Sequence, residues 1–454
     1  MNTINSAVRI LDNLTKQRYL REILPCLLPL LLAGQLIAWI VLLPGGLRGL
    51  ADFRQLYAAG YMVRTGNGHD LYNYEAQKRF QNQLVAQNRM AVPFIRPAYQ
   101  ALFFVPLSLL SYREAYLVFL VFNICLLGFC YLLLRSRLKN LAGYFSWLPL
   151  ALFLSFLPVS IALLQGQDTI ILMTLLAAAM VLQRRNRDFF AGFLIGLGLF
   201  KLQVVLPIFV LFIAGRRWRF ASGFAGSAIL VTVVSDWVLA FAPIGSSLAW
   251  LWSVGSGAAS RTGAVEIVFD TSFMPNLRGL ISGLIGGVLP TSYLQIVTLA
   301  ISGTTFLVAA IWGRVKLSRS DALVLAITAS AVVTYYLLIH DLSVMLLPIL
   351  AILDRSMEAG DNQMLLDRLS AWLATFLLVA PMCIFILPHH FYVVSLPLLG
   401  LLGTLLFSSN RIEGGRGPVE NDPWTPDVGL AQAHVASFRP NDWKSINERY
   451  IELA

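Results

Sequence analysis

Ten polar side chains stand at the ends of long apolar stretches of this sequence, where a membrane would make ionisable groups costly to bury. Each residue type among them suggests a chemical task. A carboxylate can take a proton as a general base, an ammonium can hold a phosphate as a point charge, and side-chain amides can donate and accept hydrogen bonds. The candidates are Asp52, Gln165, Gln167, Asp168, Lys201, Asp270, His340, Asp341, His389 and His390.

Asp52 is the candidate general base. It comes directly before a stretch in which Phe53, Tyr57 and Tyr61 recur at helical spacing. This pattern predicts an amphipathic helix that lies in the membrane interface with its aromatic side chains at headgroup level. Two interpretations of Asp52 stay open, because it could cap this helix or be presented at the membrane surface as a base.

Three further groups also have two interpretations each. The stretch 165–168, Gln-Gly-Gln-Asp, is either a plain turn or a site whose amides bind a sugar, and its glycine permits close backbone approach. Lys201 lies between two apolar segments, where it either snorkels towards the interface or binds a phosphate. His340 and Asp341 form either a solvated turn or a pair that orients a polar substrate.

The composition places these candidates in a membrane protein. Of the 454 residues 57% are hydrophobic and only 13% are charged, and the mean hydropathy is +0.70, whereas a soluble domain carries about 25% charged residues. Continuous apolar stretches favour helices over the alternating pattern of a β-barrel. We predict an all-α polytopic membrane protein, with a bilayer-embedded body over 1–408 and a polar, flexible cytoplasmic tail over 409–454.

About 12 transmembrane helices are expected. Eight stretches approach the roughly 20 residues that a spanning helix needs, namely 24–43, 115–134, 144–164, 220–243, 292–313, 321–339, 370–387 and 391–408. Shorter candidates are 168–183, 189–200, 202–214 and 342–354. The segments 98–110 and 277–289 are shorter than a full span, and we expect them to be re-entrant or interfacial.

Basic residues predict the orientation, because cytoplasmic loops are enriched in Lys and Arg. The clusters placed inside are Arg9/Lys16/Arg18/Arg21, Arg135/Arg137/Lys139, Arg184/Arg185/Arg187, Arg216/Arg217/Arg219, Arg314/Lys316/Arg319 and Arg355 with Arg368. Clusters on both sides of 189–214 require this segment to run out and back, with a bend near Lys201. Both termini are then cytoplasmic, the loops 44–97 and 244–276 lie outside, and the polar candidates gather on the outer face of the cell membrane.

Several other classes of protein are disfavoured. The formal charge of +10 resides in short basic loops and gives no reason to expect nucleic acid as a partner. The four cysteines lie in apolar segments without metal-ligand spacing, so neither disulfides nor a metal site is expected. No P-loop is present, which argues against nucleotide hydrolysis, and no cofactor is expected. His389 and His390 are best interpreted as a simple outer turn.

Several blocks of residues together resemble glycosyltransferase family 87, the polyprenyl-phosphate-mannose-dependent mannosyltransferases of the GT-C superfamily. The blocks are Asp52-Phe53, Tyr57-Ala58-Ala59-Gly60 and Gly68-His69-Asp70-Leu71-Tyr72, then Arg96-Pro97-Ala98-Tyr99, Gln165-Gly166-Gln167-Asp168, Ala191-Gly192 with Gly196 and Lys201, and His340-Asp341-Leu342. Their order and spacing cover most of 45–350. Asp168 stands where the family usually has Asn.

The resemblance implies a GT-C membrane body that moves a sugar, most simply mannose, from a polyprenyl-phosphate carrier to a glycolipid or glycan acceptor at the outer membrane surface. Transfer would invert the anomeric carbon, with Asp52 in the first outer loop as the general base. The candidates for the donor phosphate are Lys201, Arg96 and Arg64. The candidates for substrate contact are Gln165, Gln167, Asp168, His340, Asp341 and Tyr57.

Two other functions stay open. A transporter or flippase of lipid-linked sugars would share the many helices and a polar cavity, but transporters often have related halves, and the sequence shows no convincing internal repeat. A polysaccharide polymerase would use a related lipid-linked donor. Such enzymes often rely on an arginine-rich outer loop, whereas the loop 244–276 contains one arginine, Arg261.

Overall fold

The computed structural model describes residues 17–408, apart from 88–89, 241–243, 256, 267–269, 318–321 and 360–363. The expected polar tail 409–454 lies outside the described residues. Among these described residues, seven helical stretches are long and apolar enough to cross a membrane, namely Arg21–Leu47, Tyr112–Arg135, Asp188–Ala214, Trp218–Val238, Thr291–Trp312, Leu365–Phe385 and Pro388–Phe407. The protein is therefore an α-helical, membrane-embedded protein, as expected, while the total of about 12 crossings stays a prediction.

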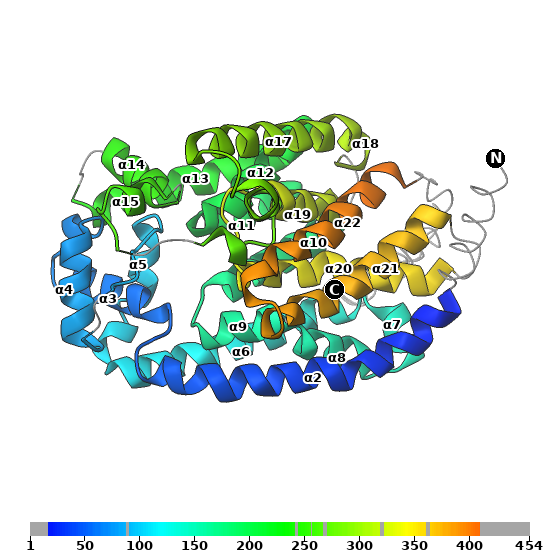
Figure 1. Cartoon of the computed structure of the whole chain (residues 1–454), viewed down its shortest axis with the longest axis horizontal. Coiled ribbons are helices and arrows are strands. Elements are labelled where there is room, and N and C mark those ends of the chain that lie inside the picture. The colour runs from blue at the N-terminus through cyan, green and yellow to red at the C-terminus, as the bar shows by residue number, and fades with distance from the viewer. Residues whose placement is uncertain are drawn as a thin grey trace, which may run out of the picture. The chain divides into compact units, whose positions relative to one another are not determined.

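The longest helices are α2 (Gln17–Leu47), α6 (Tyr112–Arg135), α13 (Trp218–Val238) and α17 (Thr291–Trp312), shown in Figure 1. Shorter helices complete the body, namely α10 (Thr169–Arg184), α18 (Arg314–Leu317), α20 (Leu346–Ala359), α21 (Leu365–Val379), η7 (Ala380–Phe385), η8 (Pro388–Val394) and α22 (Ser395–Phe407). α17 carries exposed apolar side chains such as Ile296, Leu307 and Ile311, which is the pattern of a helix that faces lipid.

The segment 188–214 forms a hairpin, as the basic clusters predict. It consists of α11 (Asp188–Leu197), η3 (Gly198–Lys201) and α12 (Leu202–Ala214). Its length and composition would also suit one span, but Arg217, just beyond its end, donates to the carboxylate of Asp188 at its start, at 2.5 and 2.9 Å. The chain therefore returns to the end from which it came, and Lys201 lies at the turn.

The helix α13 packs against both α11 and α12 (Figure 1), and its contacts confirm that these two helices run in opposite directions. α11 runs parallel to it, because an added Cβ at Gly192 would collide with Phe220 and one at Gly196 with Phe224. α12 runs antiparallel to it, because Phe212 stacks on Phe220 and Phe209 on Phe224, with ring centroids 3.9 and 4.1 Å apart.

Two stretches expected as continuous spans are broken, so these predictions are wrong. The stretch 144–164 is divided into α7 (Lys139–Tyr144), α8 (Leu148–Ser155) and α9 (Leu157–Leu164). Pro158 occupies the first turn of α9, where its missing N–H costs nothing. The carbonyl of Ser155 accepts a hydrogen bond from the side chain of Gln35.

The stretch 321–339 is the second broken one, since α19 (Ala322–Val333) ends early and the backbone from 334 to 340 is not helical. The hydroxyl of Thr334 donates to the carbonyl of Gln203 at 2.8 Å, and its carbonyl accepts from the amide of Asn276 at 2.6 Å. These two contacts satisfy polar groups of the irregular backbone that a helix would otherwise pair.

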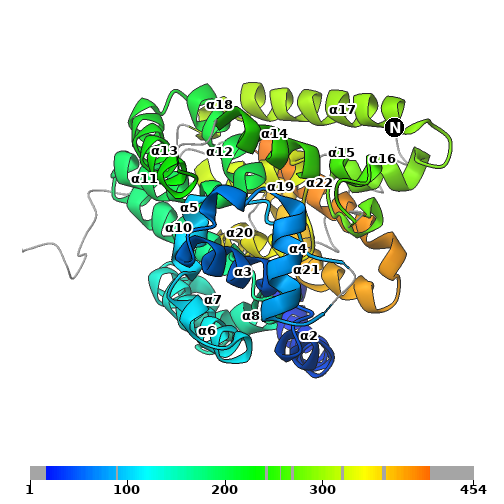
Figure 2. The same cartoon turned by 90° about the vertical axis from the view of Figure 1, so that its left-hand side faces the viewer.

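The two loops expected outside gather at one end of the body, at the left of Figure 1 and facing the viewer in Figure 2. Their helices are α3 (Phe53–Arg64), η1 (Gly68–Asp70), α4 (Tyr74–Leu84), α14 (Ile244–Gly255) and α15 (Ala258–Arg261). The loops are joined by an ion pair of 2.6 Å between Lys78 and Glu266. The short segments 98–110 and 277–289 hold α5 (Tyr99–Phe104) with η2 (Leu107–Leu109) and α16 (Leu277–Ile285), none of which has spanning length.

The helix predicted after Asp52 exists as α3, but its aromatic side faces protein. Phe53 is fully buried and packs on Phe104, Tyr112 and Phe119 at 6.1, 5.8 and 5.2 Å between ring centroids. The expected placement of these rings at headgroup level is therefore wrong for Phe53, because α5 and α6 supply a closer apolar surface.

Candidate active site

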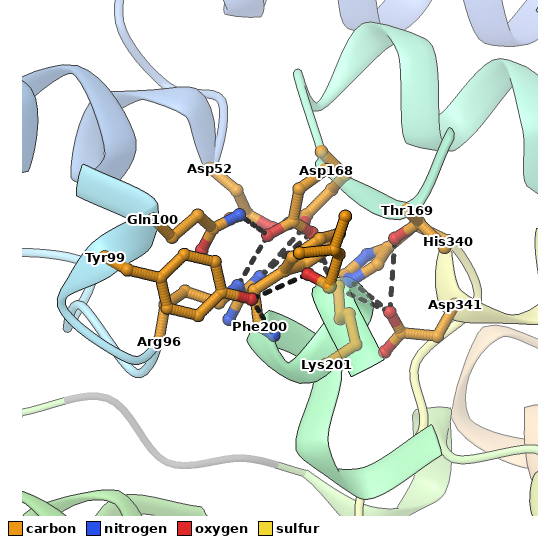
Figure 3. A network of polar contacts seen from close by, with 12 residues as sticks. Asp52, Arg96, Tyr99, Gln100, Asp168, Thr169, Phe200, Lys201, His340 and Asp341 are labelled. Atoms are coloured by element: carbon orange, nitrogen blue, oxygen red, sulfur yellow. Dashed lines mark hydrogen bonds and ion pairs between the residues drawn. The ribbon is translucent and has the colours of Figure 1, made fainter. Parts of the chain in front are cut away.

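Five separate segments bring polar side chains together in Figure 3. Asp52 precedes α3, the stretch 96–100 leads into α5, the turn 165–169 joins α9 to α10, Lys201 ends η3, and the pair 340–341 opens η5 (Asp341–Met345). Four of these segments carry residues that the sequence places at the outer ends of apolar segments, and the fifth carries Arg96, a candidate for the donor phosphate. The structure thus assembles most of the expected site.

The turn 165–168 is pressed against the start of α3. The backbone N–H of Asp52 donates to the side chain of Gln165 at 3.2 Å, and the N–H of Phe53 donates to the Gln165 carbonyl at 3.0 Å. Gly166 has a φ of +59°, and a Cβ there would lie 2.6 Å from Cβ of Phe53. Glycine is therefore required at this position by both conformation and space.

Asp168 is the fully buried centre of the cluster. Its carboxylate accepts hydrogen bonds from Arg96 Nε at 2.7 Å and Gln100 Nε2 at 2.6 Å, and Lys201 Nζ lies 3.1 Å away. Charge-assisted contacts of this kind are what allow a carboxylate to stay ionised away from water.

Lys201 is equally enclosed, with 1% of its side chain exposed. Its ammonium contacts Asp341 Oδ1 at 2.7 Å, Asp168 Oδ1 at 3.1 Å and Gln167 Oε1 at 3.3 Å. An ammonium has three hydrogens to donate, and these three acceptors match them. The snorkelling interpretation of Lys201 is therefore wrong, because its charge is held inside the protein.

Burial and charge act in opposite directions on the pair at the start of η5. Burial alone would raise the pKa of Asp341, but the Lys201 ammonium, His340 and Arg96 together outweigh burial and keep this pKa below its ordinary value. For His340, burial lowers the pKa, and this effect exceeds the attraction of Asp341, whose Oδ1 lies 3.6 Å from Nε2. His340 is therefore neutral near pH 7, and the solvated turn is excluded as an account of this pair.

Asp52 differs from the other carboxylates of the cluster because its side chain is partly exposed. One oxygen, Oδ2, accepts a hydrogen bond of 2.6 Å from Gln167 Nε2. Asp52 occupies the N-cap position of α3, yet its side chain makes no capping hydrogen bond. The capping interpretation is thus wrong, and Asp52 is a carboxylate at the rim of the cluster with an accessible face.

Several expected residues lie outside this cluster. Arg64, at the far end of α3 and about 18 Å from Asp52 by helix rise, donates to Ser108 Oγ at 2.9 Å. The Tyr57 hydroxyl donates to the carbonyl of Leu110 at 2.7 Å. Asp270 caps η4 (Thr271–Phe273), and His389 and His390 lie in η8 in contact with Phe273 and Tyr392.

Three residues of the cluster were not assigned from the sequence. Gln100 binds Asp168, Thr169 donates to Asp341 at 3.3 Å, and the Tyr99 hydroxyl donates to the carbonyl of Leu197 while accepting from the N–H of Phe200. Tyr99 thereby fixes the break that presents Lys201. A signal existed for Gln100, since it follows Arg96 at a distance of four residues.

The arrangement divides into a charge-balanced interior and a reactive rim. Arg96 and Lys201 offset Asp168 and Asp341, so the interior needs no further counter-ion. The rim offers a partly exposed carboxylate, Asp52, and such a group can accept a proton from a substrate hydroxyl.

Comparison with known protein families gives a match over the centre of the chain. The model of glycosyltransferase family 87 matches residues 94–340, which is more than half of the 454-residue chain. The matched region contains Arg96, the turn 165–168, Lys201 and His340. Asp341 directly follows it, whereas Asp52 lies 42 residues before its first residue, 94. No curated protein and no solved structure matches the chain.

Proposed function

The chain belongs to glycosyltransferase family 87, and we propose that it transfers a sugar, most simply mannose, from a polyprenyl-phosphate carrier to a hydroxyl of a glycolipid or glycan on the outer face of the cell membrane. The observation that carries this proposal is the partly exposed Asp52 carboxylate at the rim of a buried, charge-balanced cluster. Membership in a glycosyltransferase family favours sugar transfer over transport of lipid-linked sugars.

Asp52 acts as the general base in this proposal. The acceptor hydroxyl oxygen attacks the anomeric carbon of the sugar while its proton passes to the Asp52 carboxylate. The bond between the anomeric carbon and the phosphate oxygen breaks, and its electron pair leaves with the polyprenyl phosphate. A single displacement of this kind inverts the anomeric carbon, and the base contributes roughly 10²- to 10⁴-fold to the rate.

The leaving phosphate needs cationic or hydrogen-bonding partners. Arg96 and Lys201 are the cations of the cluster, and their donors already face carboxylates. A phosphate at this site therefore shares these cations with Asp168 and Asp341, and the neutral imidazole of His340 adds a hydrogen-bond donor. We assign Gln165, which is partly exposed, to contact with the sugar. A Lys201→Ala enzyme with unchanged donor affinity would remove Lys201 from this role.

The test is transfer by the purified protein with a panel of radiolabelled polyprenyl-phosphate sugars and a hydroxyl acceptor. We expect a product with one of these donors and none with a nucleotide sugar, and inversion at the anomeric carbon. Movement of lipid-linked sugar across liposomes without any transfer product would contradict the proposal.

A further inference from the structure

The side chain of Gln167 joins the buried cations to the proposed base. It is 2% exposed. Its Nε2 donates to Asp52 Oδ2 at 2.6 Å, while its Oε1 accepts from Arg96 Nη2 at 3.2 Å and Lys201 Nζ at 3.3 Å. Both ends of one amide are thus engaged with charged groups of opposite sign.

The surroundings permit only one orientation of this amide. A flipped amide would direct its NH₂ group at two cations and its carbonyl oxygen at a carboxylate, so all three contacts would become repulsive. Arg96 and Lys201 therefore fix the oxygen on their side, and the donor must point at Asp52. For Gln165, the orientation of the amide is set by a backbone N–H, that of Asp52, which donates to its Oε1.

We propose that Gln167 is a positioning residue for Asp52 and is not a sugar ligand. The inference rests on the proposed function, in which Asp52 is the base. Gln167 donates to Oδ2 of Asp52, and no hydrogen bond to Oδ1 of Asp52 is found among the described residues. Oδ1 is therefore the oxygen that receives the proton of the acceptor hydroxyl. The amide also sets the rotation of the carboxylate, and misplacement of a reacting group by about 1 Å can cost roughly 100-fold in rate.

Other titratable groups also act on Asp52. Tyr112 of α6, and Tyr336 and His340 of the segment after α19, are close enough to interact electrostatically with its carboxylate. Substitutions at Gln167 leave all of them in place. A change in the pH–rate profile of such a variant therefore reports the contact between Gln167 and Asp52.

Two variants separate positioning from folding and from substrate binding. Gln167→Leu removes both ends of the amide, and we expect kcat to fall about 10- to 100-fold with little change in KM, as for loss of one charge-assisted hydrogen bond. Gln167→Glu keeps an acceptor for Arg96 and Lys201 but sets a second carboxylate against Asp52. Two carboxylates in contact share a proton, so the acidic limb of the pH–rate profile should move to higher pH.

The matched control is Gln183→Leu. Gln183 is also a buried glutamine, at the other end of α10, and neither end of its amide has a hydrogen-bond partner among the described residues. This variant should keep the wild-type kcat and pH profile. Thermal melts of all variants in detergent identify any that fail to fold.

The decisive arm repeats Gln167→Leu in an Asp52→Asn background. If Gln167 acts through Asp52, Gln167→Leu lowers kcat by less than about twofold in the Asp52→Asn background. An equal loss in both backgrounds, an unmoved pH profile in Gln167→Glu, or a rise in KM alone would overturn the inference while leaving Asp52 as the base. Full activity of Asp52→Asn would reject the base itself, so the two failures are distinguishable.

Discussion

Two sets of carboxylates beside helix N-termini differ in what they bind: Asp354 caps a helix, whereas Asp52 and Asp168 do not. Asp354, near the end of α20, accepts hydrogen bonds from the backbone N–H groups of Asn140 and Leu141 in α7, at 2.9 and 3.0 Å. Asp52 and Asp168 occupy the N-cap positions of their own helices, and neither side chain makes a capping bond.

The difference indicates what each region is for. A carboxylate that caps a helix satisfies orphan N–H groups and so stabilises local structure. Asp168 and Asp341 instead bind Arg96 and Lys201, which are 72 and 140 residues away from them in the chain. Ionisable side chains that make no capping bond and come together from distant segments are typical of a functional site. The predictions below test this division between the structural Asp354 and the cluster around Asp52.

Substitution of Asp52 should have the largest effect. Asp52→Asn keeps the shape of the side chain but removes the base, and we expect transfer to fall roughly 10²- to 10⁴-fold. Because Asp52 caps no helix, the melting temperature in detergent should stay within about 2 °C of the wild type. Full transfer activity, or a large loss of stability, would mean that Asp52 has a structural role like that of Asp354.

Substitution of Lys201 should show how the interior of the cluster is stabilised. Lys201→Met leaves Asp341 without its closest cation, and breaking a buried pair in this way costs about 3–5 kcal/mol, so the yield of folded protein and the melting temperature should both fall. The matched control adds Asp341→Asn, which removes the opposing charge and should restore much of the stability. Equal stability of the single and double variants would show that the pair is not charge-coupled.

Asp354→Ala should have a smaller effect, and the effect should be on the melting temperature and not on kcat. Loss of a helix cap costs about 0.5–2 kcal/mol, so the melting temperature should fall by a few degrees while kcat stays at the wild-type value. Asp354→Asn is the matched variant: its Oδ1 keeps an acceptor for the backbone N–H groups of Asn140 and Leu141, so it should lower the melting temperature less than Asp354→Ala does. If kcat of Asp354→Ala is reduced at an assay temperature well below its melting temperature, Asp354 is coupled to the site.

Much of the site could be predicted because apolar lengths and basic loops determine which ends of the segments lie together. The turn at Lys201 is an example, since Arg clusters flank 189–214 on both sides, and the pair of Arg217 with Asp188 agrees. The helix breaks near 156 and 334 could not be predicted. Their exposed carbonyls are satisfied by Gln35 and Asn276, which lie 120 and 58 residues away, and no local pattern reveals such partners.

The sequence ranks Lys201 first among the basic candidates, but the partners of Arg64 and Arg96 were beyond it. Both residues lie in the same loop, and nothing local to either predicts what it binds. Arg96 reaches Asp168, whereas Arg64 binds Ser108. The difference comes from the direction of α3, which begins beside the turn at Gln165 and carries Arg64 away from it.

The smallest predicted effect concerns two histidines, each of which lies at the same distance from the aspartate that follows it in the chain. His340 Nε2 lies 3.6 Å from Asp341, and His69 Nε2 lies 3.6 Å from Asp70, but the His340 side chain is 7% exposed and that of His69 58%. Burial lowers the pKa of His340 in the folded protein. Below a pH of about 6.5 the unfolded chain therefore binds a proton at this position that the folded protein does not.

Stability should then fall as the pH drops below about 6.5, by at most roughly 1.4 kcal/mol for each pH unit until the folded-state pKa is reached. His340→Gln removes this proton uptake, so its melting temperature should decline less steeply than the wild type between pH 7 and pH 5. His69→Gln is the matched control and should follow the wild type. An unchanged slope in His340→Gln would mean that His340 becomes charged inside the cluster, and Asp341 would then have to be its counter-ion as well as that of Lys201.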